Sequence, residues 1–121
     1  MEDNKVSYEC SDNDLLNERV IYAFACGQNI KYIGICESRK TKLKDRLERY
    51  LKNKSEEQNS TNYRVVKEIE RCLKDGNDVE IYAWKPLCKL SYENLEIDLI
   101  IGLEYSLIEE FVEKEGWNKK R

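Results

Sequence analysis

Apolar and polar positions alternate in three stretches of the chain, and this pattern predicts three β-strands. Residues 19–26 and 30–36 are rich in β-branched and aromatic side chains, with turn-forming residues 27–29 between them, so they predict a β-hairpin. Residues 79–84 alternate in the same way and precede Pro86, which ends a strand. The pattern places one hairpin early in the chain and a third strand after its middle.

The turn determines which residues of the hairpin face each other. If residues 27–29 form a three-residue loop with Asn29 in the left-handed conformation, Tyr22 and Tyr32 lie on one face as diagonal neighbours. The facing pairs are then Cys26 with Ile30, Phe24 with Tyr32, and Tyr22 with Gly34. Because Gly34 has no side chain, this register predicts open space beside the Tyr22 phenol. A slip of one residue would destroy the arrangement.

Apolar residues at helical spacing predict a helix over residues 41–54. Its leucines recur every four residues, and Arg46 and Tyr50 flank this stripe at the edge of the core. Both side chains would therefore lie between the core and solvent.

A polar linker at residues 55–60 separates this helix from a second one. The second helix is predicted to begin at Thr61 or Asn62, which can cap it, and to stop at Gly76. Residues 92–115 predict one long helix or two abutting helices. Strands and helices in this proportion indicate an α+β domain.

The length of 121 residues fits one globular domain. Residues 1–18 are acidic and polar, so they predict a mobile or loosely attached arm before a domain at residues 19–121. No apolar run approaches the roughly 20 residues that cross a bilayer, and the N-terminus lacks the features of a secretion signal. We expect neither secretion nor membrane insertion.

The cysteine and histidine content narrows the chemistry. Five cysteines without a Cys-x-x-Cys pair predict reduced thiols in a cytoplasmic protein rather than a disulfide framework or a zinc site. The chain has no histidine, so catalysis would depend on Tyr, Glu, Asp, Lys or Cys.

The net charge of −3 argues against attraction of the whole protein to a phosphate backbone. Basic residues nevertheless concentrate at residues 39–54 and 119–121, while acidic residues dominate residues 1–18 and 93–115. Any nucleic-acid site must therefore be a local patch.

Glu104 is the strongest single candidate for chemistry. Its helical neighbours are all apolar: Ile100, Ile101, Leu107 and Ile108. Its carboxylate would therefore point toward the core, where burial costs several kcal/mol unless a cation or hydrogen-bond donors compensate it. A bound metal ion, a salt bridge to Arg46 or a lysine, and a side chain that reaches out to solvent all remain open. Glu109, in contrast, has a polar surrounding typical of a solvated face.

Tyr22 and Tyr32 are candidates for proton transfer. A free phenol has a pKa of about 10, so a base role requires nearby cations, such as Arg46 or Lys31, to lower it. The alternative is that these tyrosines only pack in half-buried strands and that Arg46 is one solvent-exposed charge of a basic helix.

Five short motifs stand in a fixed order along the chain. They are Val20-Ile21-Tyr22, Tyr32-Ile33-Gly34, Leu43-x-x-Arg46-x-x-x-Tyr50, Gly102-Leu103-Glu104-Tyr105-Ser106-Leu107-Ile108 and Gly116-Trp117-Asn118. One such match is a weak signal. Five in this order, on fitting strands and helices across about residues 19–118, resemble the GIY-YIG nuclease superfamily.

Two positions of this sequence depart from the usual pattern of that superfamily. Val20 stands where the family often has Gly, and Ile35 stands where a Lys often follows the second motif. Tyr50 occupies a position that holds His in some members, which agrees with a chain without histidine. Assistance by a lysine would have to come from elsewhere.

The resemblance implies a small three-stranded antiparallel sheet flanked by helices and a site that hydrolyses DNA phosphodiester bonds. Glu104 would be the main protein ligand of one Mg²⁺ or Mn²⁺ ion. Tyr22 would act as general base on the attacking water or assist its activation, and Arg46 would stabilise charge on the phosphate.

The resemblance also implies supporting roles around this centre. Tyr32 and Tyr50 would order the water or bind the phosphate, and Gly34 would leave room for the DNA backbone. Asn118 would hold the site from the C-terminal side or contact a phosphate, unless it is only a loop residue after the last helix. An enzyme of this size that cuts both strands would form a homodimer or act twice.

Two other functions remain open. The chain could be a catalytically inactive domain of the same fold that binds DNA or a protein, which its acidic balance favours. It could also be a purely structural domain in which Glu104 and Arg46 neutralise each other. Metal binding discriminates between the structural domain and the nuclease.

Overall fold

The computed structural model describes residues 13–52, 61–112 and 116–118. Its centre is a three-stranded antiparallel sheet, as the resemblance implies, and the strand order is β2-β1-β3. The strands are β1 (Ile21–Cys26), β2 (Asn29–Ile35) and β3 (Val79–Trp84), and the longer helices are α2 (Leu43–Lys52), α3 (Thr61–Lys74) and α4 (Leu99–Phe111). The predicted α+β class is confirmed.

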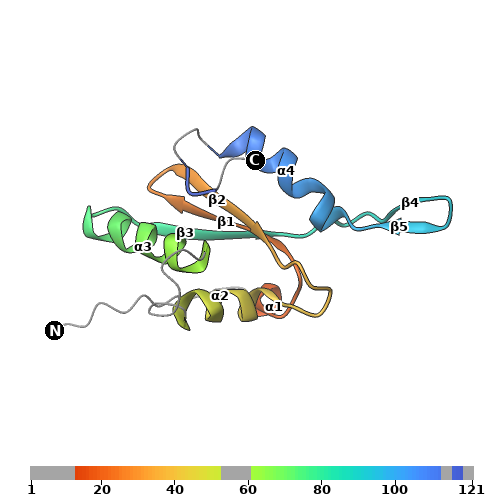
Figure 1. Cartoon of the computed structure of the whole chain (residues 1–121), viewed down its shortest axis with the longest axis horizontal. Coiled ribbons are helices and arrows are strands. Elements are labelled where there is room, and N and C mark those ends of the chain that lie inside the picture. The colour runs from red at the N-terminus through yellow and green to blue at the C-terminus, as the bar shows by residue number, and fades with distance from the viewer. Residues whose placement is uncertain (1–12, 53–60, 113–115, 119–121) are drawn as a thin grey trace.

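Helices cover both faces of the sheet. Helices α2 and α3 pack on one face and α4 lies on the other, as Figure 1 shows. The first core contains alternate residues of β1, including Tyr22 and Phe24, packed on Leu43 and Leu47 of α2. The second core contains the intervening residue Ile21 and the isoleucines of β2, packed on Ile100 of α4. This alternation follows from the period of two along a strand.

The hairpin register differs from the prediction near the turn. Cys26 pairs with Asn29, so the loop has two residues, and Gly27 rather than Asn29 adopts a positive φ of 63°. A β-bulge then inserts Lys31 as an extra residue of β2. The bulge restores the predicted pairing further along the strands. Phe24 with Tyr32 and Tyr22 with Gly34 are confirmed, whereas Cys26 with Ile30 is wrong.

The start of the predicted last helix is a second hairpin instead. Strand β4 (Leu90–Tyr92) pairs with β5 (Leu95–Ile97), and the turn residues Glu93 and Asn94 both have positive φ. This hairpin projects from the body of the domain (Figure 1). Helix α4 then begins after Asp98, whose side chain accepts a hydrogen bond from the Ile101 amide at 3.2 Å. The local turn and this cap account for the later start of the helix.

The last residues of the predicted acidic arm are attached to the domain. Helix α1 (Asn13–Leu16) lies beside α2, and Leu15 and Leu16 pack against the first core. The carbonyl of Glu18 accepts a hydrogen bond from the Leu43 amide at 2.8 Å. The rest of the arm, the predicted linker at residues 55–60 and the basic tail at residues 119–121 lie outside the described residues.

One pair of cysteines forms a disulfide, so the prediction of reduced thiols is wrong for this pair. Cys26 at the end of β1 joins Cys72 of α3, with Cα atoms 6.2 Å apart. Their separation of 46 residues gives no sequence signal, and only the packing of α3 against the sheet brings them together. Cys36 is a buried free thiol and Cys88 an exposed one. Within the described ranges, no helix is long and apolar enough to cross a membrane.

Candidate active site

Three tyrosine hydroxyls meet on the face of the sheet that α2 covers. The hydroxyl oxygens of Tyr22 and Tyr50 share a hydrogen bond at 2.8 Å, and Tyr50 donates another to Tyr32 at 3.3 Å. All three rings are buried and pack edge-on or tilted against one another; Tyr22 and Tyr50 also meet Phe24 edge-on, and Tyr32 stacks on it. Nη2 of Arg46 lies 3.5 Å from the Tyr22 hydroxyl oxygen as its donor. Residues from β1, β2 and α2 thus form one polar cluster, as the sequence predicts.

Gly34 has a different surrounding from the one expected. A Cβ at this position would lie 2.5 Å from the Tyr22 hydroxyl oxygen and 2.9 Å from a ring carbon of Tyr32. The space beside the phenol is therefore not open, because the Tyr22 ring itself lies across Gly34. The prediction of open space is wrong, and the glycine is needed for the position of Tyr22.

Burial governs the protonation of the tyrosine cluster. Loss of solvation raises the pKa of Tyr22 to about 12, and the nearby Tyr32 adds to this effect. Arg46 lowers the pKa, as the sequence suggests, but burial outweighs it. Tyr22 is therefore a neutral phenol at neutral pH in the protein alone.

The partners of Tyr22 are also held in fixed charge states. Burial raises the pKa of Tyr32 and raises that of Tyr50 well above its ordinary value. Burial opposes the charge of Arg46, but the neighbouring phenol oxygens of Tyr22 and Tyr50 raise its pKa overall. The guanidinium also lies over the Tyr50 ring at 5.6 Å. Arg46 is thus a permanent positive charge beside three neutral hydroxyls.

Glu104 adds a negative charge to the same cluster. Its side chain is half-buried on α4, whereas Glu109 on the same helix is exposed, as predicted. Burial above all, and also the charge of Glu104, raise the pKa of Tyr32. Of its apolar neighbours, Ile100, Leu107 and Ile108 contact the second core, whereas Ile101 is half exposed. Glu104 therefore lies at the border between core and solvent, close enough to act on Tyr32 electrostatically.

The ligand set available to a metal ion is small. The described part of the chain contains no group of three or more His, Cys, Asp or Glu side chains that could hold a metal. A cation here would depend on the Glu104 carboxylate, with waters and substrate oxygens as its other ligands. Such a set fits Mg²⁺, which keeps several waters and often binds through one or two carboxylates.

Asn118 connects the C-terminal segment to the edge of the sheet. Its side-chain nitrogen donates to the Ile33 carbonyl at 2.8 Å, and its side-chain oxygen accepts from the Ile33 amide at 3.0 Å. The amide of the buried Trp117 donates to the carbonyl of Lys31, the extra residue of the bulge, at 2.6 Å. These bonds hold β2 in register, so Asn118 supports the site from the C-terminal side. A direct contact with phosphate stays a prediction.

Arg64 is a member of this site that the sequence did not indicate. It lies near the start of α3, and its Nη1 donates to the Trp117 carbonyl at 2.6 Å. Its charge, with that of Arg46, lowers the pKa of Tyr32, although burial outweighs both. Nε and Nη2 of Arg64 and Nε of Arg46 are buried without a hydrogen-bond partner among the described residues. Buried donors without partners are costly, so they favour an anion at this place.

Arg19 is a second residue whose role the sequence did not indicate. Its guanidinium donates to the carbonyls of Cys36, Glu37 and Ser38 and forms an ion pair with Asp98 at 2.9 Å. Asp98 caps α4, so this pair fixes the helix that carries Glu104 against the end of β2. Neither partner has a sequence signal, because they are far apart in the chain.

The fold has a solved counterpart. The chain is similar in structure to bacteriophage T4 EndoII, a GIY-YIG-type endonuclease whose structure is that of a glutamate-to-alanine mutant. The TM-score is 0.59 at 26% sequence identity, over 78% of this chain and 70% of that chain. The chain has the GIY-YIG nuclease fold. No protein-family model matches its sequence, and no curated protein sequence matches it.

The GIY-YIG assignment agrees with the five motifs. The first two occupy β1 and β2, the third lies on α2, the fourth on α4, and Gly116-Trp117-Asn118 returns to the edge of β2. Val20, which replaces the usual glycine of the first motif, is completely buried in the first core. The domain accommodates this departure by packing the larger side chain.

Proposed function

We propose that this GIY-YIG domain is a metal-dependent endonuclease that hydrolyses phosphodiester bonds in DNA. The observation that supports the proposal most directly is the cluster of Tyr22, Tyr32 and Tyr50 with Arg46 and the nearby Glu104, in a fold shared with an endonuclease. It joins phenol hydroxyls, a fixed cation and a carboxylate, as the reaction requires.

In the proposed reaction, Arg46 stabilises negative charge on the phosphate oxygens. The Tyr22 hydroxyl accepts a hydrogen bond from the attacking water and orients it. Because burial raises the pKa of Tyr22 to about 12, Tyr22 could take the water's proton only after it has lost its own phenolic proton to solvent, and the positive charges of Arg46 and of a bound cation would favour that loss. Tyr50 holds the Tyr22 hydroxyl in place by a direct hydrogen bond, and Tyr32 in turn accepts a hydrogen bond from Tyr50.

We propose Glu104 as the ligand of one Mg²⁺ or Mn²⁺ ion. The half-buried Glu104 carboxylate, whose charge reaches Tyr32, suits a hard cation that keeps most of its waters. Such an ion would neutralise charge on the leaving oxygen. Gly34 allows the Tyr22 ring to lie across the strand. Asn118 holds β2 in place through its hydrogen bonds with Ile33. A contact of Asn118 with the DNA backbone is also proposed.

The second candidate is a DNA-binding or protein-interaction module of the same fold without catalysis. The raised pKa of Tyr22 favours it, because a neutral phenol is a poor base. Supercoiled plasmid incubated with the purified protein in Mg²⁺, in Mn²⁺ and in EDTA separates the two. The nuclease yields nicked or linear DNA only with metal. Bound but uncut plasmid at low salt and high protein concentration would favour the module instead.

We also propose that the chain forms a homodimer. Large apolar side chains are exposed on the projecting hairpin, where Tyr92 and Leu95 are 67% and 71% accessible, and Trp84 on β3 is half exposed. Contiguous exposed apolar surface marks interaction sites, and most soluble homo-oligomers are closed dimers. Sedimentation should give a dimeric mass that Tyr92→Ser with Leu95→Ser reduces to the monomer. A wild type that is monomeric at all concentrations would exclude the dimer.

A further inference from the structure

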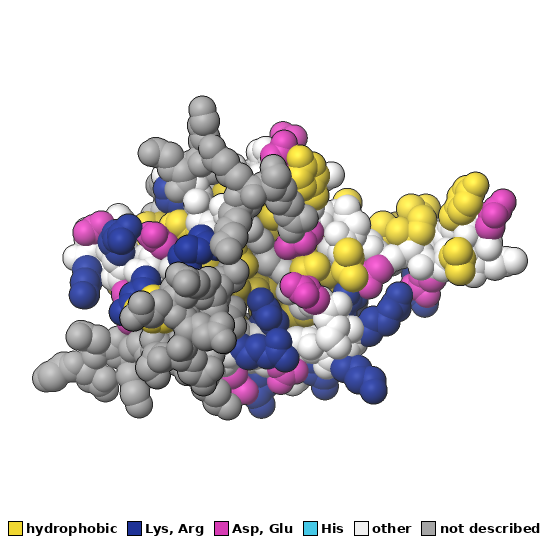
Figure 2. Space-filling view, in the orientation of Figure 1, with side chains coloured by type: hydrophobic (Ala, Val, Ile, Leu, Met, Phe, Trp, Pro, Cys, Tyr) yellow, Lys and Arg dark blue, Asp and Glu magenta, His cyan; other side chains and the backbone are white. Residues whose placement is uncertain are grey.

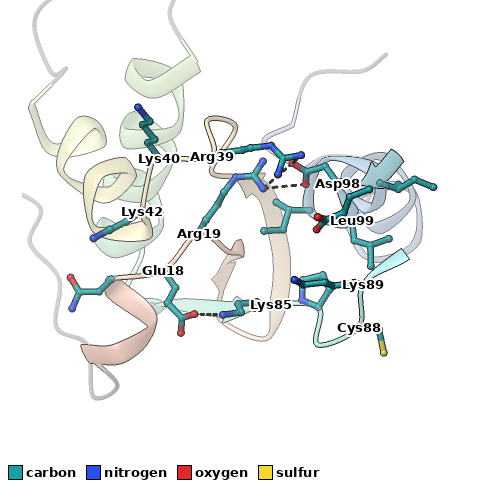
Figure 3. A pocket seen from close by; sticks show the side chains of 15 residues that line it. Glu18, Arg19, Arg39, Lys40, Lys42, Lys85, Cys88, Lys89, Asp98 and Leu99 are labelled. Atoms are coloured by element: carbon teal, nitrogen blue, oxygen red, sulfur yellow. Dashed lines mark hydrogen bonds and ion pairs between the residues drawn. The ribbon is translucent and has the colours of Figure 1, made fainter. Parts of the chain in front are cut away.

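A basic groove lies between the start of α2 and the start of α4. Its volume is about 500 Å³, and it is formed by the residues that follow α1, the loop before α2, the segment after β3, and the segment from the end of β5 to the first residues of α4. Figure 3 shows Arg19 crossing the groove toward Asp98, with Lys40 and Lys42 on the α2 side and Lys85 and Lys89 on the opposite side. The groove is therefore built from four separate segments of the chain.

Positive charge exceeds negative charge in this groove. Its basic residues are Arg19, Arg39, Lys40, Lys42, Lys85 and Lys89, and its acidic residues are Glu18, Glu96 and Asp98. Asp98 pairs with Arg19 and Arg39, and Glu18 pairs with Lys85. The ammonium groups of Lys40, Lys42 and Lys89 form no ion pair with any residue in the described ranges, and all three side chains are exposed.

The groove lies at the starts of the two helices that carry residues of the candidate active site. Lys42 precedes Arg46 by four residues, which is about one helical turn, and Ile100 precedes Glu104 by the same distance. The two helices that carry Arg46 and Glu104 thus begin at the walls of the groove. Figure 2 shows Lys and Arg side chains gathered in the middle of this face and continuing toward the projecting hairpin. A polyanion bound at the cluster would extend along this path.

We propose that this groove binds the sugar-phosphate backbone of DNA next to the scissile phosphate, with Lys40, Lys42 and Lys89 as its phosphate contacts. This inference rests on the proposed nuclease function. A protein with a net charge of −3 gains little from long-range attraction, so local lysines must supply its affinity. Flexible lysines at the rim bind phosphates as point charges and read no sequence, which fits contacts that position the substrate.

The paired residues of the groove have a different role. Asp98 is half-buried, and although desolvation opposes its charge, Arg19 and Arg39 lower its pKa. The charges of Arg19, Arg39 and Asp98 therefore neutralise one another in part within the protein, and the two arginines are less available to attract phosphate. This division predicts that the unpaired lysines, rather than Arg19, determine the salt dependence of DNA binding.

The test measures binding of a fluorescent DNA duplex in EDTA across a range of salt concentrations. The groove variant is Lys40→Gln with Lys42→Gln and Lys89→Gln. The control is Lys67→Gln with Arg71→Gln and Lys74→Gln, which removes the same charge from the outer side of α3, where Lys67 and Arg71 are exposed. Each lost phosphate contact lowers the slope of log K against log salt by about 0.9. For the groove variant, this slope should be smaller than that of the wild type by about 2 to 3, and the affinity for DNA should be at least tenfold lower. The control variant should keep the wild-type slope and the wild-type affinity.

Equal slopes for the two variants, or no duplex binding by the wild type, would overturn the groove proposal. If a mononucleotide competed for binding as effectively as unlabelled duplex, the groove proposal would also be overturned, because the groove would then bind a small phosphate ligand. Failure of the nuclease proposal has a different result: duplex binding that depends on the three lysines, without cleavage of plasmid in Mg²⁺ or Mn²⁺. Unchanged thermal unfolding of both variants controls for folding.

Discussion

The Tyr22 hydroxyl lies 2.8 Å from the Tyr50 hydroxyl, in a buried hydrogen bond that joins the first strand to helix α2. The bond fixes the Tyr22 phenol in front of Arg46, whose Nη2 is 3.5 Å away. Because both rings are nearly inaccessible, the position of the phenol is set by the core and not by solvent. The same burial makes the stability of the domain depend on pH.

The domain should lose stability in alkaline solution because of Tyr22. Burial raises its pKa from 10.0 to about 12, so the folded state binds the phenolic proton more tightly than the unfolded state. This contribution is complete below about pH 10 and is lost as the pH rises through about 12, by at most about 3 kcal/mol. Denaturant unfolding at increasing pH should show this loss, and Tyr22→Phe should reduce its steepness. An equally steep loss in Tyr22→Phe would contradict the assignment.

Gly34→Ala should displace the catalytic phenol. The new Cβ would lie 2.5 Å from the Tyr22 hydroxyl oxygen, so the ring must move, at a cost of about 1–3 kcal/mol. Plasmid nicking should fall by more than tenfold. Gly102→Ala is the matched control, because a Cβ added at this position of α4 would meet no atom within 4 Å, and it should stabilise the helix by up to about 1 kcal/mol. Equal effects of the two substitutions would argue against the close approach at Gly34.

The Cys26–Cys72 disulfide should contribute strongly to stability. It closes a loop across 46 residues, for which chain entropy predicts about 4 kcal/mol. Urea unfolding with and without a reductant measures this difference. The double variant Cys26→Ser with Cys72→Ser should show the lower stability under both conditions. A wild type insensitive to the reductant would mean that the bond does not form in solution.

Arg64→Gln should weaken cleavage more than folding. The substitution removes a positive charge close to Tyr32 but leaves a side chain that can still donate to the Trp117 carbonyl. We expect nicking to fall by at least tenfold with a change in unfolding free energy of about 1 kcal/mol. Arg64→Lys should restore part of the activity because it keeps the charge. If Arg64→Gln and Arg64→Lys lose activity equally and unfold early, the role of Arg64 is structural.

The sequence predicted the centre of the fold and the side chains that lie together in the tyrosine cluster. The alternation in β1 and β2 placed Tyr22 opposite Gly34, and the helical spacing placed Arg46 and Tyr50 on one face of α2. The bulge at Lys31 could not be predicted, because its carbonyl is bound by Trp117, which is distant in the chain. Pairing across the two-residue loop depends on that bulge.

Three other features also depend on contacts between distant segments or on the absence of a buried face. Arg64 joins the site only because the C-terminal segment returns to α3, and Arg19 reaches Asp98 only in the folded domain. The hairpin at β4 and β5 is wrongly predicted as helix, because its apolar residues are exposed and follow no buried pattern. Sequence periodicity reports a buried face, and this hairpin has none.

The most direct test of the nuclease proposal compares Glu104→Gln with Glu109→Gln, an exposed position on the same helix. Supercoiled plasmid is incubated with wild type and each variant in Mg²⁺, Mn²⁺ and EDTA, and nicked and linear products are measured. We expect metal-dependent nicking by wild type and Glu109→Gln, and a loss of at least a hundredfold in Glu104→Gln with unchanged duplex binding. Nicking by Glu104→Gln at the wild-type rate would contradict the proposal.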